Sequence, residues 1–515
     1  MPVQEQSLRA ASAALHASTY DVAAGLSEAT LTDFFAAHHG AEEASEASVY
    51  RGKGRAAELG LSWSYHVKTP ARLDLLPIAP AAFARIYTGW MRTVPELARF
   101  VDAKRTLGSE PNEAGTLADD PPPNVQLQVA NIEVVVETDT GIRVPFNYAV
   151  TITGFIEIGE DGDGRVLRIV PIAAKVTDPA ALNALVASAV PKAAGMPAAD
   201  CVELRKLILY LLNVLIANRI GSFVRQFGLP VPIDVVQGVT IADVGMEVVD
   251  DLLVLMGRLS TTPPVVSDEQ TALASGDHDR IMMAAQSLKS APIGVLANAE
   301  TLPVRSLGER AALGAWPARG LFIILHERLF QALAATVGYQ TSAESCRSAF
   351  GLKGCLGYAL RLWGVTAQVR PNGLHIAAQF KGSGWLRVCI STHCGDKCHK
   401  VSANPESRPD FDAMFAIRGR ELWMAAKPGA FDIRWKIGGL PWPFNRLIEW
   451  ALNTLSDVAL LFARILYKQF EQKLTTFPEV FPGTTLRYTP TLDRQILKDP
   501  AQPALMILGE LDFLP

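Results

Sequence analysis

The longest hydrophobic pattern in the first half of the chain lies between Asp200 and Ser260. Leu204 to Ala217 contains no Pro or Gly and is rich in Leu, which predicts a helix. From Leu207 to Leu212 the run is apolar on every side, so this part should be enclosed by protein or by a ligand. The pattern then becomes one-sided, and Leu229-Pro230-Val231-Pro232 predicts an extended exit from the helix. A strand is expected from Glu247 to Ser260.

The same order of elements closes the chain. A one-sided apolar pattern from Phe444 to Leu474 predicts a second long helix, about 46 Å long at the usual rise per residue. Phe477-Pro478 ends this helix, and a final strand is expected at Met506–Asp512. That strand and Val254–Ser260 share one order of residue types: three apolar residues, Gly, a charged residue, Leu and a polar residue. A repeat with a period of about 250 residues indicates two copies of one domain.

The first copy begins with a strand and a helix between Tyr20 and His39. Ser27 is the expected N-cap of this helix, and three apolar side chains at helical spacing form its inner face: Leu31, Phe34 and Phe35. Residues 40–57 are polar and basic and are expected to form a loop, whereas Leu61–Val67 alternates as a half-buried strand. Gly-, Glu- and Pro-rich chain follows a helical pattern, so an inserted helix and loop are predicted at about residues 78–123.

Three long strands follow in the first copy. They are expected at residues 125–136, 144–155 and 166–176, with Phe146 on the second of them. The turn Asp161-Gly162-Asp163-Gly164 is a hairpin signal, so the three strands should form an antiparallel meander. A helix is expected from Pro179 to Val190, interrupted at Pro191.

The second copy begins at Gly320 with a strand, and a helix follows from His326 to Val337 with Leu329 and Leu333 on its inner side. Further strands are expected at residues 366–370, 374–380, 384–390, 411–418, 421–426 and 431–437. Helices that pack on a meandering sheet in both copies indicate the α+β class. The predicted organisation is an N-terminal domain at residues 1–262, a connecting region at 263–318 and a C-terminal domain at 319–515.

Composition narrows the range of functions. The chain has 515 residues, of which 49% are apolar and 19% are charged, so it is globular with some apolar surface to spare. Its net charge of −4 argues against a nucleic-acid partner and against a strongly cationic membrane-surface protein. The N-terminus has no basic and apolar segment typical of a secretory signal. We therefore expect a cytoplasmic protein, or one exported by a route without a cleaved signal.

The order of elements resembles the TULIP superfamily, the tubular lipid-binding proteins that include bactericidal/permeability-increasing protein. The resemblance is carried by Phe227-Gly228-Leu229-Pro230-Val231-Pro232, by Gly238-Val239-Thr240 and by the strand through Val254-Leu255-Met256-Gly257. It covers nearly the whole chain. It implies two tandem domains, each with a long and a shorter helix packed on a highly twisted antiparallel sheet that encloses an apolar pocket for lipid acyl chains.

The chain departs from the secreted members of that family in two ways. Those relatives carry a disulfide in the first domain and a cationic tip for lipopolysaccharide, whereas here Cys201 is the only cysteine of the first half and the net charge is negative. Endotoxin binding is therefore not expected. Bacterial toxin-cluster members without secretion signals are the closer analogy.

The resemblance assigns a set of apolar side chains to the ligand pocket. On helical spacing alone these side chains could equally be ordinary core, and both interpretations remain open. The candidates are Leu31, Phe34, Phe35, Phe146, Leu207, Leu211, Leu215, Leu329, Leu333, Leu447, Ala451, Leu455 and Phe462.

The cysteines of the second half offer the one candidate metal site. Cys389, Cys394, Cys398 and His399 have the ligand types of a zinc site, but their spacing is not that of a zinc finger. The alternative is a loop at a strand end with free thiols, or with a local disulfide in an oxidising compartment. The same choice applies to Cys346 and Cys355, with reduced thiols favoured by the missing signal.

No motif makes a case for an enzyme or for a cofactor. The Asp161-Gly162-Asp163-Gly164 turn lacks the closing Glu of a calcium loop, and no Gly-x-Ser-x-Gly elbow is present. The sequence therefore predicts a non-enzymatic lipid-binding or lipid-transfer protein. Its expected ligand is a phospholipid, a fatty acid or another hydrophobic molecule, with transient contact to a membrane. Two other hypotheses remain: an interaction subunit of a toxin or surface complex with filled cores, and a lipid-modifying enzyme that uses the cysteine-rich loop.

Overall fold

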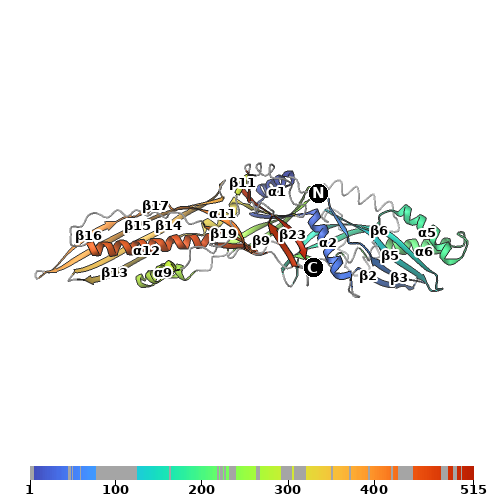
Figure 1. Ribbon diagram of the computed structural model, residues 1–515, viewed down its shortest axis with the longest axis horizontal. Helices are drawn as coiled ribbons and strands as arrows, with labels where there is room; N and C mark the ends of the chain where they lie inside the picture. Colours follow the sequence, from blue (N-terminus) through green and yellow to red (C-terminus); the bar gives the residue numbers. More distant parts are fainter. Residues whose placement is uncertain are drawn as a thin grey trace, which may run out of the picture.

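The computed structural model shows an elongated molecule with one sheet at its centre and one sheet toward each end (Figure 1). The residues that the structure describes are 5–43, 48, 50–57, 60–76, 124–161, 164–216, 220, 224, 228–230, 239–261, 267–290, 304–306, 320–349, 352–370, 373–392, 395–418, 421–426, 445–476, 485–490, 496–499 and 502–514. Within these ranges no helix is long and apolar enough to cross a membrane.

The central sheet joins the two halves of the chain. Its order is β11-β22-β23-β12-β1-β10-β9, with β21 paired to β23. The first half supplies β1 (Val22–Ser27), β9 (Val239–Val249) and β10 (Leu252–Thr261). The second half supplies β11 (Val304–Ser306), β12 (Gly320–His326), β21 (Thr485–Pro490), β22 (Ile496–Asp499) and β23 (Ala504–Leu514). Because β1 and β12 are antiparallel neighbours, the halves share one hydrogen-bonded sheet.

Both faces of the central sheet are covered. Helix α1 (Glu5–Ala17) lays Leu8 and Leu15 on one face, against Phe322 and other apolar residues of the strands. The opposite face belongs to the main core, which also includes the inner side chains of both outer sheets. Every residue of β1 and β12 is therefore buried, which explains why these strands are almost continuously apolar in sequence.

The N-terminal sheet has the order β2-β3-β5-β6-β7-β8, with β4 paired to β5. Its strands are β2 (Arg51–Ala56), β3 (Leu61–Val67), β4 (Arg72–Leu75), β5 (Val125–Thr138), β6 (Arg143–Asp161), β7 (Gly164–Val176) and β8 (Gly228–Pro230). Helix α2 (Glu28–Glu43) follows β1, while α5 (Pro179–Ala194) and α6 (Val202–Tyr210) lie at the far end of this sheet (Figure 1). The predicted meander of three long strands is confirmed.

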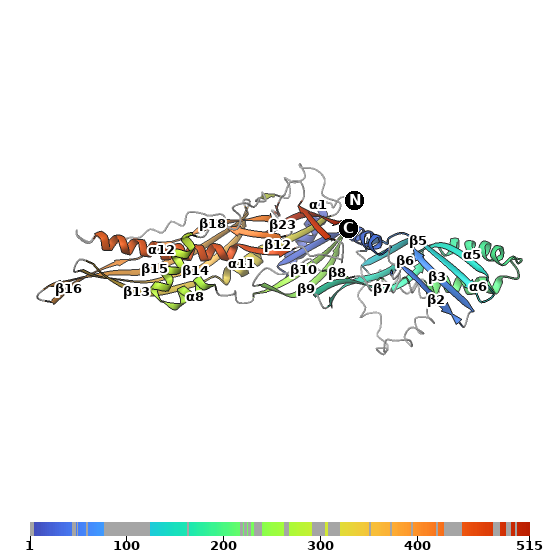
Figure 2. The same ribbon diagram turned by 60° about the horizontal axis from the view of Figure 1, so that its bottom comes forward.

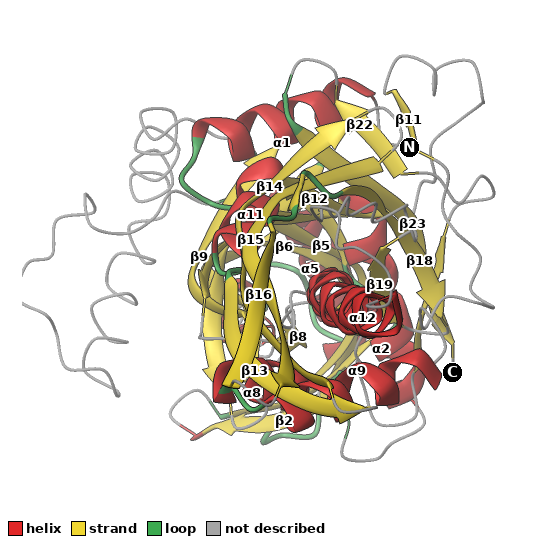
Figure 3. Ribbon diagram, turned by 90° about the vertical axis from the view of Figure 1, so that its left-hand side faces the viewer, coloured by secondary structure: helices red, strands yellow, loops and turns green. Residues whose placement is uncertain are grey.

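The C-terminal sheet has the order β13-β14-β15-β18-β19-β20, with β16 and β17 paired to β15. Its strands are β13 (Tyr339–Ala349), β14 (Leu352–Arg370), β15 (Gly373–Thr392), β16 (Gly395–Ala403), β17 (Glu406–Ser407), β18 (Asp410–Arg418), β19 (Glu421–Ala426) and β20 (Gln472–Thr476). The long helix α12 (Asn445–Phe470) lies within the curve of these strands, as the end-on view shows (Figure 3). Helices α8 (Asp268–Ser275) and α9 (His278–Ser290) lie beside β13, and α11 (Glu327–Ala335) follows β12 (Figure 2).

The α+β class and the tandem arrangement expected from the sequence are confirmed. Each half has a strand followed at once by a helix (β1 and α2, β12 and α11), an outer antiparallel sheet, and closing strands that return to the centre. The strands Val254–Ser260 and Met506–Asp512, matched by residue type, lie in β10 and β23. These two strands flank the β1–β12 pair on opposite sides of the central sheet.

Residues 51–56 were expected in a loop, and that expectation is wrong. They form β2, which pairs with β3 so that Gly52 lies opposite Tyr65 and Gly54 opposite Trp63. A Cβ atom at either glycine would overlap the aromatic ring across from it. The basic, glycine-rich sequence of β2 therefore suits an edge strand whose two glycines leave room for the rings of Tyr65 and Trp63.

The strand expected from Glu247 to Ser260 is in fact a hairpin. Asp250 takes φ 52°, a left-handed conformation that Asp tolerates better than most residues, and the chain reverses between β9 and β10. Helix α5 also continues through Pro191 and ends at Gly195, which has φ 63°. In the second half, β14 and β15 are much longer than the short strands expected there, and β13 was not expected.

The helix expected from Leu204 changes its form. It is an α-helix through Tyr210 and a π-helix from Leu211 to Ile216. The exit predicted at Leu229–Pro232 is extended as far as it is described, since Gly228–Pro230 forms β8. The predicted insertion at 78–123, the strand at 431–437, Val231-Pro232, Phe477-Pro478 and part of the connecting region lie outside the described residues.

Candidate functional site

An apolar cavity lies where the N-terminal sheet meets the central sheet. Its volume is ≈ 30 Å³, and it is enclosed by helix α2, three strands of the N-terminal sheet and β10. All eight lining residues are apolar: Leu31, Phe34, Phe35, Leu73, Ile156, Leu167, Ile169 and Leu253. Of the thirteen pocket residues expected from the sequence, these include the three on α2.

Helix α2 is held over the cavity by its N-terminus. The Ser27 hydroxyl accepts a hydrogen bond from the Thr30 amide (3.2 Å), which confirms Ser27 as the N-cap. Leu31, Phe34 and Phe35 share one face because they are three and four residues apart, and the two phenyl rings meet edge to face. Thr32 hydrogen-bonds both backbone groups of Leu73, so the helix is fixed to β4 beside the cavity.

The cavity is small for a lipid in this structure. Ligand pockets usually have about 300–1,000 Å³, whereas this cavity has ≈ 30 Å³, about the volume of one water molecule in the liquid. A void lined only by Leu, Ile and Phe stays dry and costs roughly 24 cal/mol per Å³ relative to a filled core. The lining is chemically suited to an acyl chain, but side chains would have to move apart to admit one.

The other expected pocket residues lie in the core, away from this cavity. Phe146, Leu211, Leu329, Leu333, Leu447, Ala451, Leu455 and Phe462 are buried, and Leu207 is partly buried. The side chain of Leu215 lies outside the described residues. Leu329 and Leu333 belong to α11, the counterpart of α2, and Phe462 of α12 meets Phe380 of β15 edge to face. Three of the thirteen candidates therefore line this cavity.

A polar contact marks the entry to the π-helix. The Tyr148 hydroxyl donates to the Leu212 carbonyl at 3.5 Å, and burial raises the pKa of this phenol. The Asn213 amide donates to the Leu209 carbonyl at 2.9 Å. Asn213, the polar residue in this apolar run, thus supplies a hydrogen-bond donor to a backbone carbonyl of its own helix.

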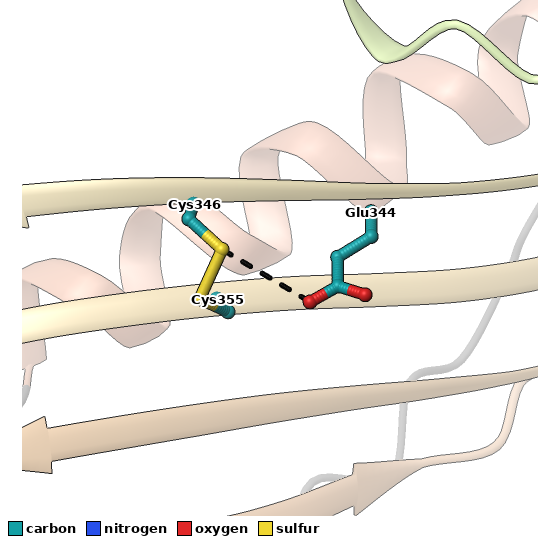
Figure 4. Close-up of side chains that lie close together, drawn as sticks. All are labelled: Glu344, Cys346 and Cys355. Carbon is teal, nitrogen blue, oxygen red and sulfur yellow. Dashed lines mark hydrogen bonds between the residues drawn. A yellow bond between two sulfur atoms is a disulfide. The ribbon is translucent and has the colours of Figure 1, made fainter.

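The cysteines expected as thiols or metal ligands form disulfides. Cys389 pairs with Cys398 across β15 and β16, and Cys346 pairs with Cys355 across β13 and β14. Two of the four zinc candidates are therefore bonded to each other and are not thiolates, while Cys394 lies outside the described residues. Glu344 lies beside the Cys346–Cys355 bond (Figure 4), but oxidised sulfurs are poor metal ligands and the group is not a metal site in this state.

A second, larger concavity was not expected from the sequence. It is an open groove of ≈ 790 Å³ bounded by the end of α8 and by β13, β14 and β15. Arg361, Trp363 and Lys381 contribute charge and aromatic surface, and Gln340, Ser342 and Ser383 contribute polar groups. Only strand register brings these residues together, so no local sequence pattern signals the groove.

Comparison with known proteins finds similar chains only among solved structures. No family model matches the chain, and no curated protein matches it. Among solved structures, the chain is similar to lipopolysaccharide binding protein at 10% identity and a TM-score of 0.32, covering 96% of this chain and 99% of that one. It is similar to P47 from Clostridium botulinum A2 at 8% identity and a TM-score of 0.32, covering 96% and 97% of the two chains. P47 of Clostridium botulinum E1 gives 8% identity, the same TM-score and coverages of 96% and 99%.

Proposed function

We propose that the protein binds the acyl chains of a lipid, or another elongated hydrophobic ligand, beneath helix α2 and carries it away from a membrane. The observation that carries the proposal is the cavity whose eight lining residues are all apolar. No polar side chain in that lining would have to be desolvated without a partner, and each buried methylene of a ligand contributes about 0.8 kcal/mol.

The position of the cavity supports a site that can open. It lies at the junction of two sheets and under one helix, so moving α2 away from β7 and β10 would enlarge it without breaking a strand pair. Hydrogen bonds along the helix resist this motion. They join Thr32 to Leu73, the Leu75 amide to Glu28, the Thr30 hydroxyl to the Gly320 carbonyl, His38 to Tyr50, and His39 to the Val67 carbonyl.

The first test is native mass spectrometry of the purified full chain, followed by lipid extraction. We expect co-purifying lipid at defined stoichiometry that is released only on denaturation. A mass that equals the bare polypeptide before and after incubation with mixed lipids would overturn the proposal and favour an interaction protein.

A matched pair of substitutions on β10 locates the site. Leu253 lines the cavity, and Leu255 points into the same core two residues further along the strand. We expect Leu253→Phe to fill the void, to change the free energy of unfolding by less than about 1 kcal/mol and to reduce bound lipid. Leu255→Phe should overpack the core, cost about 1–3 kcal/mol and leave the lipid stoichiometry of the folded fraction unchanged. Equal lipid loading of the two folded variants would place the ligand elsewhere.

A further inference from the structure

The outer face of the C-terminal sheet carries a cluster of cations. Helix α12 packs on the inner face, where a Cβ at Gly354 would touch Leu447. Side chains alternate between the faces, and strand register places five basic residues on the outer one: Lys353, Arg361, Lys381, Arg387 and Lys400. We call these five residues, with Trp363 and Trp385, the basic face.

Two pairs of these cations lie directly opposite each other on neighbouring strands. Arg361 of β14 faces Lys381 of β15, and Arg387 of β15 faces Lys400 of β16. Like charges directly opposite in a sheet are destabilising. Among the side chains that the structure describes, no carboxylate lies within ion-pair distance of Arg361, Arg387 or Lys400, while register places Glu406 opposite Lys381; all four cations are exposed. An external anion would remove this repulsion.

Each cation pair has a tryptophan beside it. The Arg361 guanidinium lies 5.5 Å from the Trp363 ring centre. Arg387 and Lys400 lie 5.8 Å and 4.9 Å from the Trp385 ring centre. Trp385 lies flat over Gly357. A Cβ atom at position 357 would overlap the indole ring, so the glycine makes room for it. Indole rings interleaved with basic side chains suit the boundary between lipid headgroups and hydrocarbon.

One acidic residue lies among the cations, because register places Glu406 of β17 opposite Lys381, and the other acidic residues lie farther away. On the same face, Glu344 lies on the edge strand β13. Asp412, hydrogen-bonded to His375 at 3.0 Å, and Asp410 lie at the opposite end of β15. With five cations around one nearby glutamate, the face keeps an excess of positive charge where the groove of ≈ 790 Å³ crosses it, although the whole chain has a net charge of −4.

We propose that the basic face docks the protein on an anionic lipid bilayer, with a phosphate headgroup in the groove between Arg361 and Lys381. The inference rests on the proposed function, since the bilayer would be the source or destination of the carried lipid. It places membrane contact on the C-terminal half and lipid carriage in the N-terminal half.

The test is flotation of the full chain with vesicles of phosphatidylcholine alone or with 30% phosphatidylglycerol. We expect binding only to the anionic vesicles, falling as salt rises. Arg361→Gln with Lys381→Gln should weaken that binding roughly thirtyfold, from the usual contribution of a basic side chain near an anionic surface. The matched control is Lys53→Gln with Arg143→Gln, which removes one Lys and one Arg that are exposed on the N-terminal sheet.

The outcomes separate this inference from the proposed function. If the Arg361/Lys381 variant still co-purifies lipid but no longer floats, both stand. Equal flotation with neutral and anionic vesicles, or equal losses in the two double variants, overturns the docking surface and leaves lipid carriage untouched. Binding to double-stranded DNA that outcompetes the anionic vesicles would also overturn it. If no lipid co-purifies while anionic flotation depends on Arg361 and Lys381, lipid carriage fails and the docking surface stands.

Discussion

A pair of histidines connects the N-terminal helix to the centre of the molecule. His16 Nδ1 lies 2.8 Å from His326 Nε2, and the two rings stack. His326 is also the N-cap of α11, since its Nδ1 accepts a hydrogen bond from the Arg328 amide at 3.1 Å. Burial, with Arg328 and His16 nearby, lowers the pKa of His326 to about 4. The folded protein thus keeps this ring neutral.

This geometry predicts a stability that depends on pH. Because an unfolded His takes up a proton near pH 6.5, the unfolded state binds more protons between about pH 6.5 and pH 4. The stability contributed by neutral His326 is complete above that window and is lost as pH falls through it. We expect the wild-type protein to lose folding stability between roughly pH 7 and pH 5, and His326→Asn, which retains a capping side chain, to remove about 1 kcal/mol of that loss. The figure is kept small because His16, the neighbour of His326, is exposed and solvent screens the interaction.

The measurement is the urea midpoint of unfolding at the two pH values. His399→Asn is the control, because that ring is exposed in β16 and its surroundings change little on unfolding. An unchanged pH slope in the His326 variant would contradict the prediction.

At the scale of single residues, the sequence predicted only those cavity residues that belong to one local pattern. Leu31, Phe34 and Phe35 follow a good N-cap at helical spacing, so their common face could be inferred before their partners were known. Leu253, Ile156 and Ile169 come from three other strands, and they reach the cavity only through long-range pairing. The same holds for Arg361 and Lys381, whose opposition requires the register of two long strands.

Two equivalent glutamates, one in each half, join the short helix of that half to its outer sheet. Glu28 begins α2 and accepts a hydrogen bond from the Leu75 amide at 3.2 Å. Glu327 begins α11 and accepts one from the Val369 amide at 2.9 Å. Both amides belong to strand ends that approach the central sheet, so each contact fixes an outer sheet to the centre.

Removing either carboxylate should loosen one half only. We expect Glu327→Ala to cost about 1–3 kcal/mol, because the Val369 amide loses its acceptor where water is scarce. Glu327→Gln keeps an acceptor oxygen and should cost less, and Ala332→Ser on the exposed side of α11 is the control. Amide hydrogen exchange should rise at Val369 and stay unchanged at Leu75. Equal rises at both amides would contradict an independent anchor in each half.

Elements with one clear period were predicted well, and elements that depend on partners were not. The apolar stripe of α12 and the alternation of β5 and β6 carry their own signal. Strand β2 was missed because its glycines make space for rings on β3. The β9–β10 turn was missed because Asp250 and Asp251 interrupt an apolar run without Gly or Pro.

At the scale of the whole molecule, the central sheet makes the two halves depend on each other. Strand β1 has β10 on one side and β12 on the other, and α1 contacts strands from both halves. A chain that ends at residue 262 would expose the edge of β1 and the apolar surface that faces Phe322.

We therefore expect residues 1–262 alone to self-associate, whereas the full chain is dispersed under the same conditions. Size-exclusion chromatography with light scattering measures the difference. A monomeric fragment that unfolds cooperatively would show that the N-terminal half is complete without β12.

The pairing of β1 with β12 has one more property. Ala24 lies four residues before Glu28, Ile323 lies four residues before Glu327, and these two equivalent positions are opposite each other in the antiparallel register. A local twofold axis therefore passes between them. Two separate copies related in this way would make an isologous contact, the geometry of a closed homodimer. The chain is in effect such a dimer on one polypeptide, and because its halves are covalently joined, one could keep the apolar cavity while the other acquired the basic face.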